Sequence, residues 1–354
     1  MENERVTLKD IAEKTGLSVS TVSFALTGKG RINAKTRQKV IQQAKDMGYQ
    51  PNIIASTLSM KGRIRIGIVC PENDLYFCMV LQGIEMYYAE IAQYKVELLY
   101  FFCHGYDPED QYQKLQACAD AGVDGILLTP LTTKPIVNLV RRIVRQGVAV
   151  VTYTNDLSSA DRMCFVGQNG VLAGELAAEL MDRMLPAKAK ISLLANDSPL
   201  IITQSRMAVF SNHMKKSDKQ YQVNEKHLFP NDESATTEMA RQMIASEQPD
   251  AIYTNNMLGT IALGRAIRQM HLTKKVLVFG YDANDEIEQM MRDGIIDLTL
   301  FQDPFAQGYY SLMLLFRNLY YHQKIKKQVY YTRTLVMTKS NVSEREQMNS
   351  LFIV

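Results

Sequence analysis

The sequence lacks the features that mark membrane-spanning, secreted or disulfide-stabilised proteins. No uncharged apolar run approaches the roughly 20 residues that a membrane-spanning helix needs. The first ten residues, MENERVTLKD, mix acidic and basic side chains with no apolar segment behind them, so we expect no secretory signal. We therefore expect a cytoplasmic protein without a membrane partner.

Cysteine is present but never arranged for a bond or a metal. The five cysteines are odd in number, scattered and never spaced C-x-x-C, which argues against a disulfide framework and a structural zinc site. They are interpreted as buried, small apolar residues: Cys70, Cys78, Cys103, Cys118 and Cys164.

Motifs of catalysis are also missing. No G-x-G-x-x-G follows a strand-like run, no P-loop lysine motif occurs, and the five histidines show no ligand spacing. His104 beside Cys103 is interpreted as a loop residue. We therefore predict no enzymatic activity, no cofactor and no metal.

What the sequence does have is a basic N-terminal head. Residues 1–63 contain eleven Lys and Arg against five Asp and Glu, a net charge of +6, whereas the rest of the chain carries −3. A small basic segment on a mildly acidic body is typical of a module that meets phosphates. A solvated basic tail would have the same composition. The order of the residues is therefore needed to distinguish a folded, phosphate-binding module from such a tail.

Three short helices are predicted in the first fifty residues. Thr7 and Asp10 form a T-x-x-D box that starts the first helix, and Gly16 ends it. Ser18 is placed to cap a second helix, from Val19 to Leu26. Two short helices joined by a turn that contains glycine indicate a helix-turn-helix.

A third helix is predicted after a loop. Asn33 caps it, and Gly48 is placed to end it in the left-handed conformation. The outer face of the second helix would lie in the major groove, where short hydroxyl side chains reach phosphates and base edges. A three-helix domain used for protein contacts is the alternative.

Residues 51–63 are predicted to form a hinge helix and linker. Pro51 interrupts the preceding helix, and Asn52 can cap a new one whose apolar face contains Ile54, Ala55 and Leu58. A helix of two turns is marginal in water, because nucleation dominates its free energy. It would therefore order only against a partner.

The stretch from Val6 to Asn52 resembles the DNA-binding head of the lactose and galactose repressor family (LacI/GalR), without a gap. The motifs T-L-x-D-I-A, G-x-S-x-x-T-V-S, T-R-x-K-V and G-Y-x-P-N occur in order at the family spacing. The resemblance implies that the second helix faces an operator and that Leu58 wedges between base pairs in the minor groove. The DNA-binding set assigned on this basis is Thr7, Ser18, Val19, Ser20, Thr21, Ser23, Phe24, Thr36, Tyr49, Asn52, Ala55 and Leu58.

One position departs from that family. Many members have an arginine that reads guanine where this chain has Phe24. A phenylalanine cannot donate a hydrogen bond but can touch a thymine methyl group. Half-site rules built on the arginine are therefore not carried over.

From Ile64 onward, apolar runs of strand length alternate with amphipathic helical stretches. This rhythm predicts βαβ units in two successive sets, and hence an α/β body with parallel sheets, two lobes and a ligand cleft between them. The strand candidates are RIGIVCP, VELLYFF, DGILLTP, VAVVTY and CFVGQ, then KISLLA, DAIYTN, KVLVFGYD and LTLFQD. The helix candidates include 79–92, 110–121, 134–146, 205–216, 236–247 and 258–270.

Polar residues gather after these strands. Asp74, Thr154, Asn256, Asp282 and Gln302 follow apolar runs, where amides and carboxylates can hold hydroxyl groups. Tyr76 and Phe77 could stack on the apolar face of a sugar ring. The alternative is that each polar residue caps the helix that follows it.

The body, from about Ile64 to Thr338, is similar to the periplasmic sugar-binding fold that the same family appends to its head. The resemblance implies a two-lobed effector-binding and dimerisation domain over 64–340, after a DNA-binding domain over 1–50 and before a tail over 341–354. The effector-binding set assigned is Asp74, Tyr76, Phe77, Thr154, Arg206, Asn256, Asp282 and Gln302. Two positions depart from the family: Asn169-Gly170 replaces a usual Asp-Asn, and Met257 replaces an aspartate.

The sequence thus predicts a transcription regulator, a repressor of a carbohydrate-utilisation operon, controlled by a sugar or sugar derivative. Its expected partners are palindromic operator DNA, the effector and a second copy of the chain. A homodimer is expected because a palindrome has two-fold symmetry. The C-terminal tail lacks a sustained leucine heptad, so we do not expect a tetramer built by a terminal coiled coil. The alternatives are a solute-binding receptor and a sugar-metabolising α/β enzyme.

Overall fold

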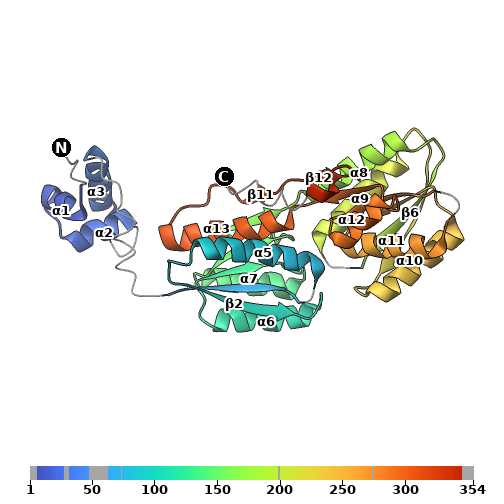
Figure 1. The fold of residues 1–354 in the computed structure, drawn as a ribbon. Helices are drawn as coiled ribbons and strands as arrows, with labels where there is room; N and C mark the ends of the chain where they lie inside the picture. Colours follow the sequence, from blue (N-terminus) through green and yellow to red (C-terminus); the bar gives the residue numbers. More distant parts are fainter. Residues whose placement is uncertain are drawn as a thin grey trace. The chain divides into compact units, whose positions relative to one another are not determined.

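The computed structural model describes residues 6–27, 32–47, 63–72, 74–197, 200–272 and 275–344. The chain forms two compact units: residues 1–63 with 320–324, and residues 64–319 with 325–354 (Figure 1). The predicted hinge helix, Gly48, Tyr49, Asn52, Ala55 and Leu58 lie outside the described residues, so these assignments stay predictions.

The head contains the three predicted helices, α1 (Leu8–Thr15), α2 (Val19–Thr27) and α3 (Ala34–Asp46). The capping box of α1 is confirmed, because the Thr7 side chain accepts from the Asp10 N–H and the Asp10 carboxylate accepts from the Thr7 N–H at 2.6 Å. Gly16 ends α1 with φ 71°, and Asn33 accepts from the Thr36 N–H at 2.7 Å to start α3. Local side-chain chemistry therefore sets these helix ends.

One small apolar core holds the three helices together. Ile11, Val22 and Val40, one from each helix, are fully buried at its centre. Ala12, Ala25 and Ala44 complete the cluster and let the helices approach closely. The outer face of α2 does not contribute to this core.

The second unit consists of two α/β lobes. The sheet of the N-terminal lobe has the order β11-β5-β4-β3-β1-β2, and all its neighbouring strands are parallel. The sheet of the C-terminal lobe has the order β12-β10-β9-β8-β6-β7, in which only β12 pairs antiparallel. The predicted pair of lobes is therefore present, with one antiparallel edge strand added.

The strands of the N-terminal lobe are β1 (Ile64–Pro71), β2 (Val96–Cys103), β3 (Gly125–Leu128), β4 (Ala149–Tyr153), β5 (Cys164–Gly167) and β11 (Val329–Tyr331). Its helices are α5 (Leu75–Glu90), α6 (Pro108–Asp120), α7 (Lys134–Arg145) and α13 (Pro304–Tyr321). Helices α6 and α7 cover one face of the sheet, and α5 and α13 run side by side on the other (Figure 1).

The strands of the C-terminal lobe are β6 (Lys190–Asn196), β7 (Gln222–Phe229), β8 (Ala251–Thr254), β9 (Leu277–Tyr281), β10 (Leu298–Phe301) and β12 (Leu335–Met337). Its helices are α8 (Gly170–Met184), α9 (Ile201–Lys215), α10 (Glu233–Glu247), α11 (Met257–Met270), α12 (Asp285–Arg292) and the short 3-10 helix η1 (Val342–Glu344). A core of alanine, methionine and aromatic residues joins α8 and α9 to this sheet.

Two glycines let α5 and α13 touch through their backbones. A Cβ at Gly83 would lie 2.0 Å from the carbonyl oxygen of Phe305, and a Cβ at Gly308 would lie 1.9 Å from that of Val80. No side chain fits at such distances, so both positions require glycine. This close packing fixes α13 against the N-terminal lobe.

The chain passes three times between the lobes, from β5 to α8, from β10 to α13 and from β11 to β12. Hydrogen bonds tie the three passages together. The Thr332 N–H donates to the Gly167 carbonyl at 2.8 Å, and the Thr332 hydroxyl donates to the Gln302 carbonyl at 3.0 Å. The lobes are therefore joined by a compact, bonded hinge.

The structure corrects one expectation about the cysteines. Cys70, Cys103, Cys118 and Cys164 are buried as predicted, but Cys78 is exposed because it lies on the outer side of α5. Among the helices of the described ranges, none is both long and apolar enough to cross a bilayer. In the same ranges, no group of three or more His, Cys, Asp or Glu could hold a metal ion.

Candidate functional site

A cavity of about 190 Å³ lies between the two lobes of the second unit. Strands of both lobes end at it, as expected for open parallel sheets. The structure brings all eight predicted effector residues to its wall: Asp74, Tyr76, Phe77 and Thr154 from the N-terminal lobe, and Arg206, Asn256, Asp282 and Gln302 from the C-terminal lobe. The volume is below the roughly 300–1,000 Å³ of drug-sized pockets and suits a small ligand.

Arg206 is the buried cation of this cavity, with 1% of its surface exposed. Its Nη1 donates to the Asn255 carbonyl at 3.1 Å, and its Nη2 donates to the Gln302 side-chain oxygen. The guanidinium also lies 4.4 Å from the centre of the Tyr281 ring, within cation–π distance. Three contacts thus hold the guanidinium rigid, which prepares it to orient a ligand.

Asp282 lies beside Arg206 but does not pair with it directly. The Gln302 amide donates to both Asp282 carboxylate oxygens, at 3.0 and 3.1 Å, so Gln302 links the carboxylate to the guanidinium. Burial raises the pKa of Asp282 to about 6, although Arg206 and Gln302 favour the ionised form. The sequence predicted all three residues, but it did not predict that the Gln302 side chain bridges the two charged groups.

Asp74 is a second carboxylate, partly buried, on the opposite wall. Its Oδ1 accepts from the backbone N–H groups of Tyr76 and Phe77, which caps α5, and its Oδ2 accepts from the Tyr106 hydroxyl at 3.3 Å. Burial raises the pKa of Asp74, and these hydrogen bonds oppose the rise. The capping role and a position in the cavity wall therefore coexist in one side chain.

Asn256 also combines both roles. Its side-chain oxygen accepts from the Gly259 N–H at 2.9 Å and caps α11, while the residue lines the cavity. Its neighbour Asn255 is a structural amide, because it accepts from the Asn196 N–H and donates to the Thr203 carbonyl. Helix capping was the alternative interpretation of these polar residues. Asn256 does cap a helix, and it also lines the cavity.

Gln307 is a residue that sequence reasoning missed. Its side-chain oxygen accepts from the Tyr76 hydroxyl at 3.0 Å and from the Thr154 hydroxyl at 2.8 Å. Its amide donates to the Gln302 carbonyl at 2.9 Å, in the passage between the lobes. The signal available in the sequence was a glutamine within a largely apolar helical stretch, and the structure shows that this glutamine is fully buried.

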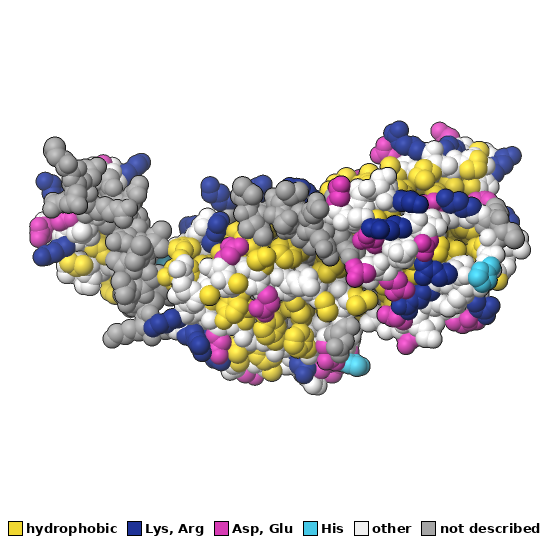
Figure 2. Space-filling model, viewed as in Figure 1, with side chains coloured by type: hydrophobic (Ala, Val, Ile, Leu, Met, Phe, Trp, Pro, Cys, Tyr) yellow, Lys and Arg dark blue, Asp and Glu magenta, His cyan; other side chains and the backbone are white. Residues whose placement is uncertain are grey.

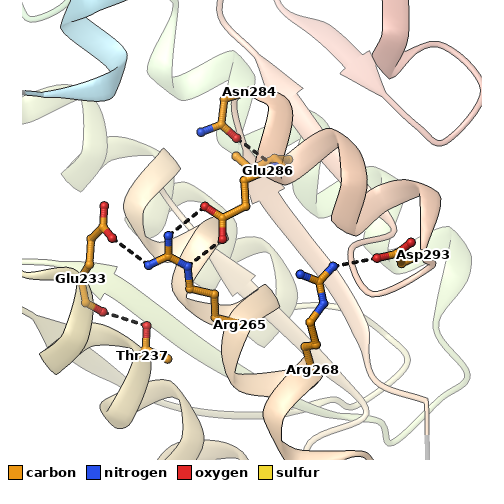
Figure 3. Close-up of polar contacts among 8 residues, drawn as sticks. Glu233, Thr237, Arg265, Arg268, Asn284, Glu286 and Asp293 are labelled. Atoms are coloured by element: carbon orange, nitrogen blue, oxygen red, sulfur yellow. Dashed lines mark hydrogen bonds and ion pairs between the residues drawn. The ribbon is translucent and has the colours of Figure 1, made fainter.

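Charged residues ring the mouth of the cavity. Glu233, at the start of α10, lines the cavity and accepts from Arg265 at 2.7 Å (Figure 3). Arg265 also donates to both oxygens of Glu286, at 2.6 and 2.8 Å, which fixes its direction. On the other lobe, Glu72 lines the cavity and its Oε1 lies 3.1 Å from the Nδ1 of His104, a loop residue directly after β2.

The outer face of α2 carries the predicted DNA-facing side chains. Val19 and Phe24 are 45% and 47% exposed, so their apolar side chains are accessible to a partner. The Ser18 hydroxyl lies 2.9 Å from that of Ser20 and 2.8 Å from that of Thr21, while Ser23 is half-buried. This face therefore combines hydroxyl groups with an exposed aromatic ring. Thr7 and Thr36, by contrast, take part in helix caps.

Comparison with known protein families gives two matches. Residues 66–322 match the periplasmic binding protein domain, and residues 7–52 match the bacterial regulatory proteins of the lacI family. The ribose operon repressor of Haemophilus influenzae is 26% identical over 285 residues, covering 78% of this chain and 81% of its own. The transcriptional repressor PurR of Vibrio vulnificus is 26% identical over 284 residues, with the same coverage.

Solved structures share the fold of the body. A solute-binding protein from Agrobacterium vitis with bound D-fucose superposes with a TM-score of 0.75 at 21% identity, over 80% of this chain and 99% of that one. A solute-binding protein from Bacillus halodurans with bound myo-inositol gives 0.73 at 19% identity, over 82% and 99%. These identities support the fold alone.

Both relatives described above are transcription regulators, and their alignments span most of this chain. The capped helices of the head and the two-lobed body with its cavity are the two parts that the family models match. The chain therefore belongs to the lacI family of bacterial transcription regulators, with a helix-turn-helix head and a periplasmic-binding-protein-like body.

Proposed function

We propose that this protein is a cytoplasmic, homodimeric repressor that binds a palindromic operator and responds to a sugar or sugar derivative held between its lobes. The target is a carbohydrate-utilisation operon. In this proposal the DNA-binding set of the head and hinge contacts the operator, and the eight cavity residues bind the effector.

The observation that carries the proposal is the convergence of those eight residues on one cavity. They come from positions 74 to 302 and from both lobes, so a ligand that touches all of them would bridge the lobes. Ligand binding would thereby favour one arrangement of the lobes over another, which is what an effector must do to change DNA affinity.

The chemistry of the cavity supports a sugar. Asp282 and Asp74 supply acceptors for hydroxyl groups, and Arg206 supplies donors in a fixed fork. Tyr76 and Phe77 present aromatic surface to the same space. Two relatives of the fold hold D-fucose and myo-inositol, both polyhydroxylated rings, and the cavity volume fits a single ring of this kind.

An apolar surface on the N-terminal lobe supports the homodimer. Met86 and Phe102 are 42% and 40% exposed, and hydrophobic side chains gather on this lobe over α5 and β2 (Figure 2). Exposed apolar patches mark interaction sites in soluble proteins. Sedimentation of the full chain at micromolar concentration should give twice the monomer mass, and a monomer with and without DNA would refute the dimer.

The test is selection of bound DNA from a random pool, with and without candidate sugars. A palindromic site whose recovery changes with one sugar would establish the operator, the effector and the direction of control together. Calorimetry with that sugar should then show a large loss of affinity for Asp282→Ala and Arg206→Ala, about 1 to 3 kcal/mol each, with operator binding retained. Unchanged affinity in both variants would place the ligand elsewhere.

Two other functions remain as outcomes of the same experiments. A solute-binding receptor would bind the sugar but select no DNA site. A sugar-metabolising enzyme would convert the ligand, which a product assay detects. The helix-turn-helix head favours the regulator over both.

A further inference from the structure

The cavity carries more negative than positive charge. Four carboxyl side chains line it, those of Glu72, Asp74, Glu233 and Asp282. Among the described residues of the wall, Arg206 is the one lysine or arginine. A ligand therefore enters a predominantly anionic space.

The carboxylates at the mouth have partners outside the cavity. Arg265 forms an ion pair with Glu233 as well as with Glu286, and the His104 ring contacts Glu72 (Figure 3 shows the Arg265 contacts). The deeper pair, Asp74 and Asp282, has no such cation. Their hydrogen-bond donors are backbone N–H groups, a tyrosine hydroxyl and an amide, and neither forms an ion pair with another described residue.

Asp74 and Asp282 therefore carry negative charge that no cation among the described residues pairs with directly. Burial raises the pKa of both carboxyl groups, and the charge of Asp74 adds to the rise at Asp282. Arg206 lowers the pKa of Asp282, but its donors already serve Gln302 and Asn255. A third negative charge placed here would be repelled by the buried carboxylate of Asp282 and the partly buried carboxylate of Asp74.

Two polar atoms of the cavity residues lack partners within the described chain. The Nε of Arg206 is a buried donor, and the Oδ1 of Asn196 is a buried acceptor, on side chains of residues 1% and 6% exposed. A buried polar group without a hydrogen bond costs free energy, so each is a place where a ligand atom is expected. A hydroxyl group, which both donates and accepts, suits either atom.

We propose that the cavity selects uncharged polyhydroxylated ligands and rejects their anionic counterparts, sugar phosphates and sugar acids, with Asn196 accepting a ligand hydroxyl. This inference rests on the proposed function, because it assumes that a sugar or derivative binds between the lobes. It adds the charge class of the effector and one residue, Asn196 at the end of β6, that the sequence did not indicate.

The test uses matched sugars that differ by one charged group. The full-length protein is titrated at pH 7.5, by calorimetry and by thermal shift, with D-glucose and D-glucose 6-phosphate, D-galactose and D-galacturonate, and D-ribose and D-ribose 5-phosphate. For each pair that binds, the anionic member should bind at least about tenfold more weakly, which corresponds to about 1.4 kcal/mol.

The variant Asp282→Asn removes one buried charge and keeps the size of the side chain. Asparagine also tolerates the left-handed backbone of this position, where φ is 66°. The Asp282→Asn variant should bind the uncharged sugar more weakly than the parent protein does. The ratio of the dissociation constants of the anionic and uncharged sugars should fall at least about threefold. The control Glu179→Gln removes an exposed charge of α8 that pairs only with Arg183 among described residues, and it should leave the ratio unchanged.

Asn196 is tested by a pair of substitutions. Asn196→Ala removes the acceptor and should weaken binding of the uncharged sugar about tenfold, while the backbone N–H still donates to Asn255. Asn196→Asp keeps an acceptor and adds a charge, so it should retain more of that binding and discriminate more strongly against the anion. Equal losses in both variants for both sugars would show that Asn196 has a packing role only.

The inference fails if the anionic member of any pair binds as tightly as the uncharged one, and the cleft assignment then still stands. If no pair binds while the operator is still selected, sugar control itself fails, and this inference falls with it. The two failures are thus distinguished by whether any sugar binds.

Discussion

Thr154 and Asp282 occupy the same position in the two lobes. Each directly follows the fourth strand of its lobe, β4 or β9, and each has a left-handed backbone, with φ of 60° and 66°. Both side chains line the cavity. Left-handed conformations of residues other than glycine cost about 1 to 3 kcal/mol and gather at binding sites. In each lobe, a left-handed residue after the fourth strand therefore places one polar side chain in the cavity wall.

A pair of substitutions at Thr154 separates its hydroxyl from its strained backbone. Thr154→Val loses the hydrogen bond to Gln307 and keeps the branched side chain, so it should lower the free energy of unfolding by about 1 kcal/mol. Thr154→Ser keeps the hydroxyl and removes a methyl group, and should be as stable as the parent. Urea unfolding measures both, and an equally destabilised Thr154→Ser would mean that the methyl group matters more.

Effector binding should weaken as the pH falls through 6. The pKa of Asp282 is raised by burial to about 6, so the carboxylate that accepts ligand hydroxyls is largely protonated at pH 5. The dissociation constant should rise roughly tenfold between pH 7 and pH 5. Calorimetry over that range tests this, with Asp282→Asn as the control whose affinity should vary less. A flat profile for the parent protein would contradict it.

Asp282→Asn should also stabilise the unliganded body at neutral pH. The folded pKa of Asp282 lies above its ordinary value of 3.8, so its favourable contribution is present below pH 3.8 and is lost as pH rises to about 6. Above that pH the ionised carboxylate destabilises the fold by about 1 to 3 kcal/mol, at about 1.4 kcal/mol for each pKa unit. Thermal unfolding at pH 7.5 and pH 4 should show a gain at the higher pH alone, and Glu179→Gln should show none at either.

Phe24→Ala should impair DNA recognition and leave the head folded. Phe24 is half-exposed on α2, so its loss should change stability by less than about 0.5 kcal/mol. Loss of an apolar contact to a base should weaken operator binding by about 1 to 3 kcal/mol. The matched control is Val22→Ala, on the buried face of the same helix, which should destabilise the head itself. Gel-shift titrations and thermal unfolding distinguish the two effects.

Leu58→Ala tests the predicted wedge of the hinge, which lies outside the described residues. A wedge acts only where the duplex is kinked, so specific binding should weaken by about 1 to 3 kcal/mol while binding to random DNA is retained. Competition titrations with operator and random duplexes measure both. Equal losses on the two duplexes would mean that Leu58 is a packing residue.

The sequence predicted what local chemistry determines. The box of Thr7 and Asp10, the cap at Asn33 and the cap of α2 by Ser18 depend on neighbours within four residues, and all three are present. The polar cavity residues that follow strands were also predicted together, because the carboxyl ends of parallel strands meet at one edge of a sheet, whereas Arg206, within α9, was assigned from the family resemblance.

What the sequence did not predict depends on distant partners. Strand β7, QVNEKHLF, is polar because it forms a sheet edge, so it lacks the apolar signal of a buried strand. Strands β11 and β12 have three residues each and are defined by pairing with β5 and β10. Gln302 bridges Asp282 and Arg206 across 96 residues of sequence, a relation that no local pattern contains.

The three passages between the lobes also constrain how the protein is made. Strand β5 pairs with β11, and Gly125 packs against Leu315 of α13, so the N-terminal lobe is completed by residues beyond 300. During synthesis the ribosome therefore releases most of the C-terminal lobe before the first lobe can close. The N-terminal lobe therefore cannot complete its sheet before the C-terminal lobe has been synthesised, and the outer side of β5 stays unpaired until β11 is available. Destabilising changes in α13 should consequently lower the yield of folded protein more than their effect on the finished molecule would indicate.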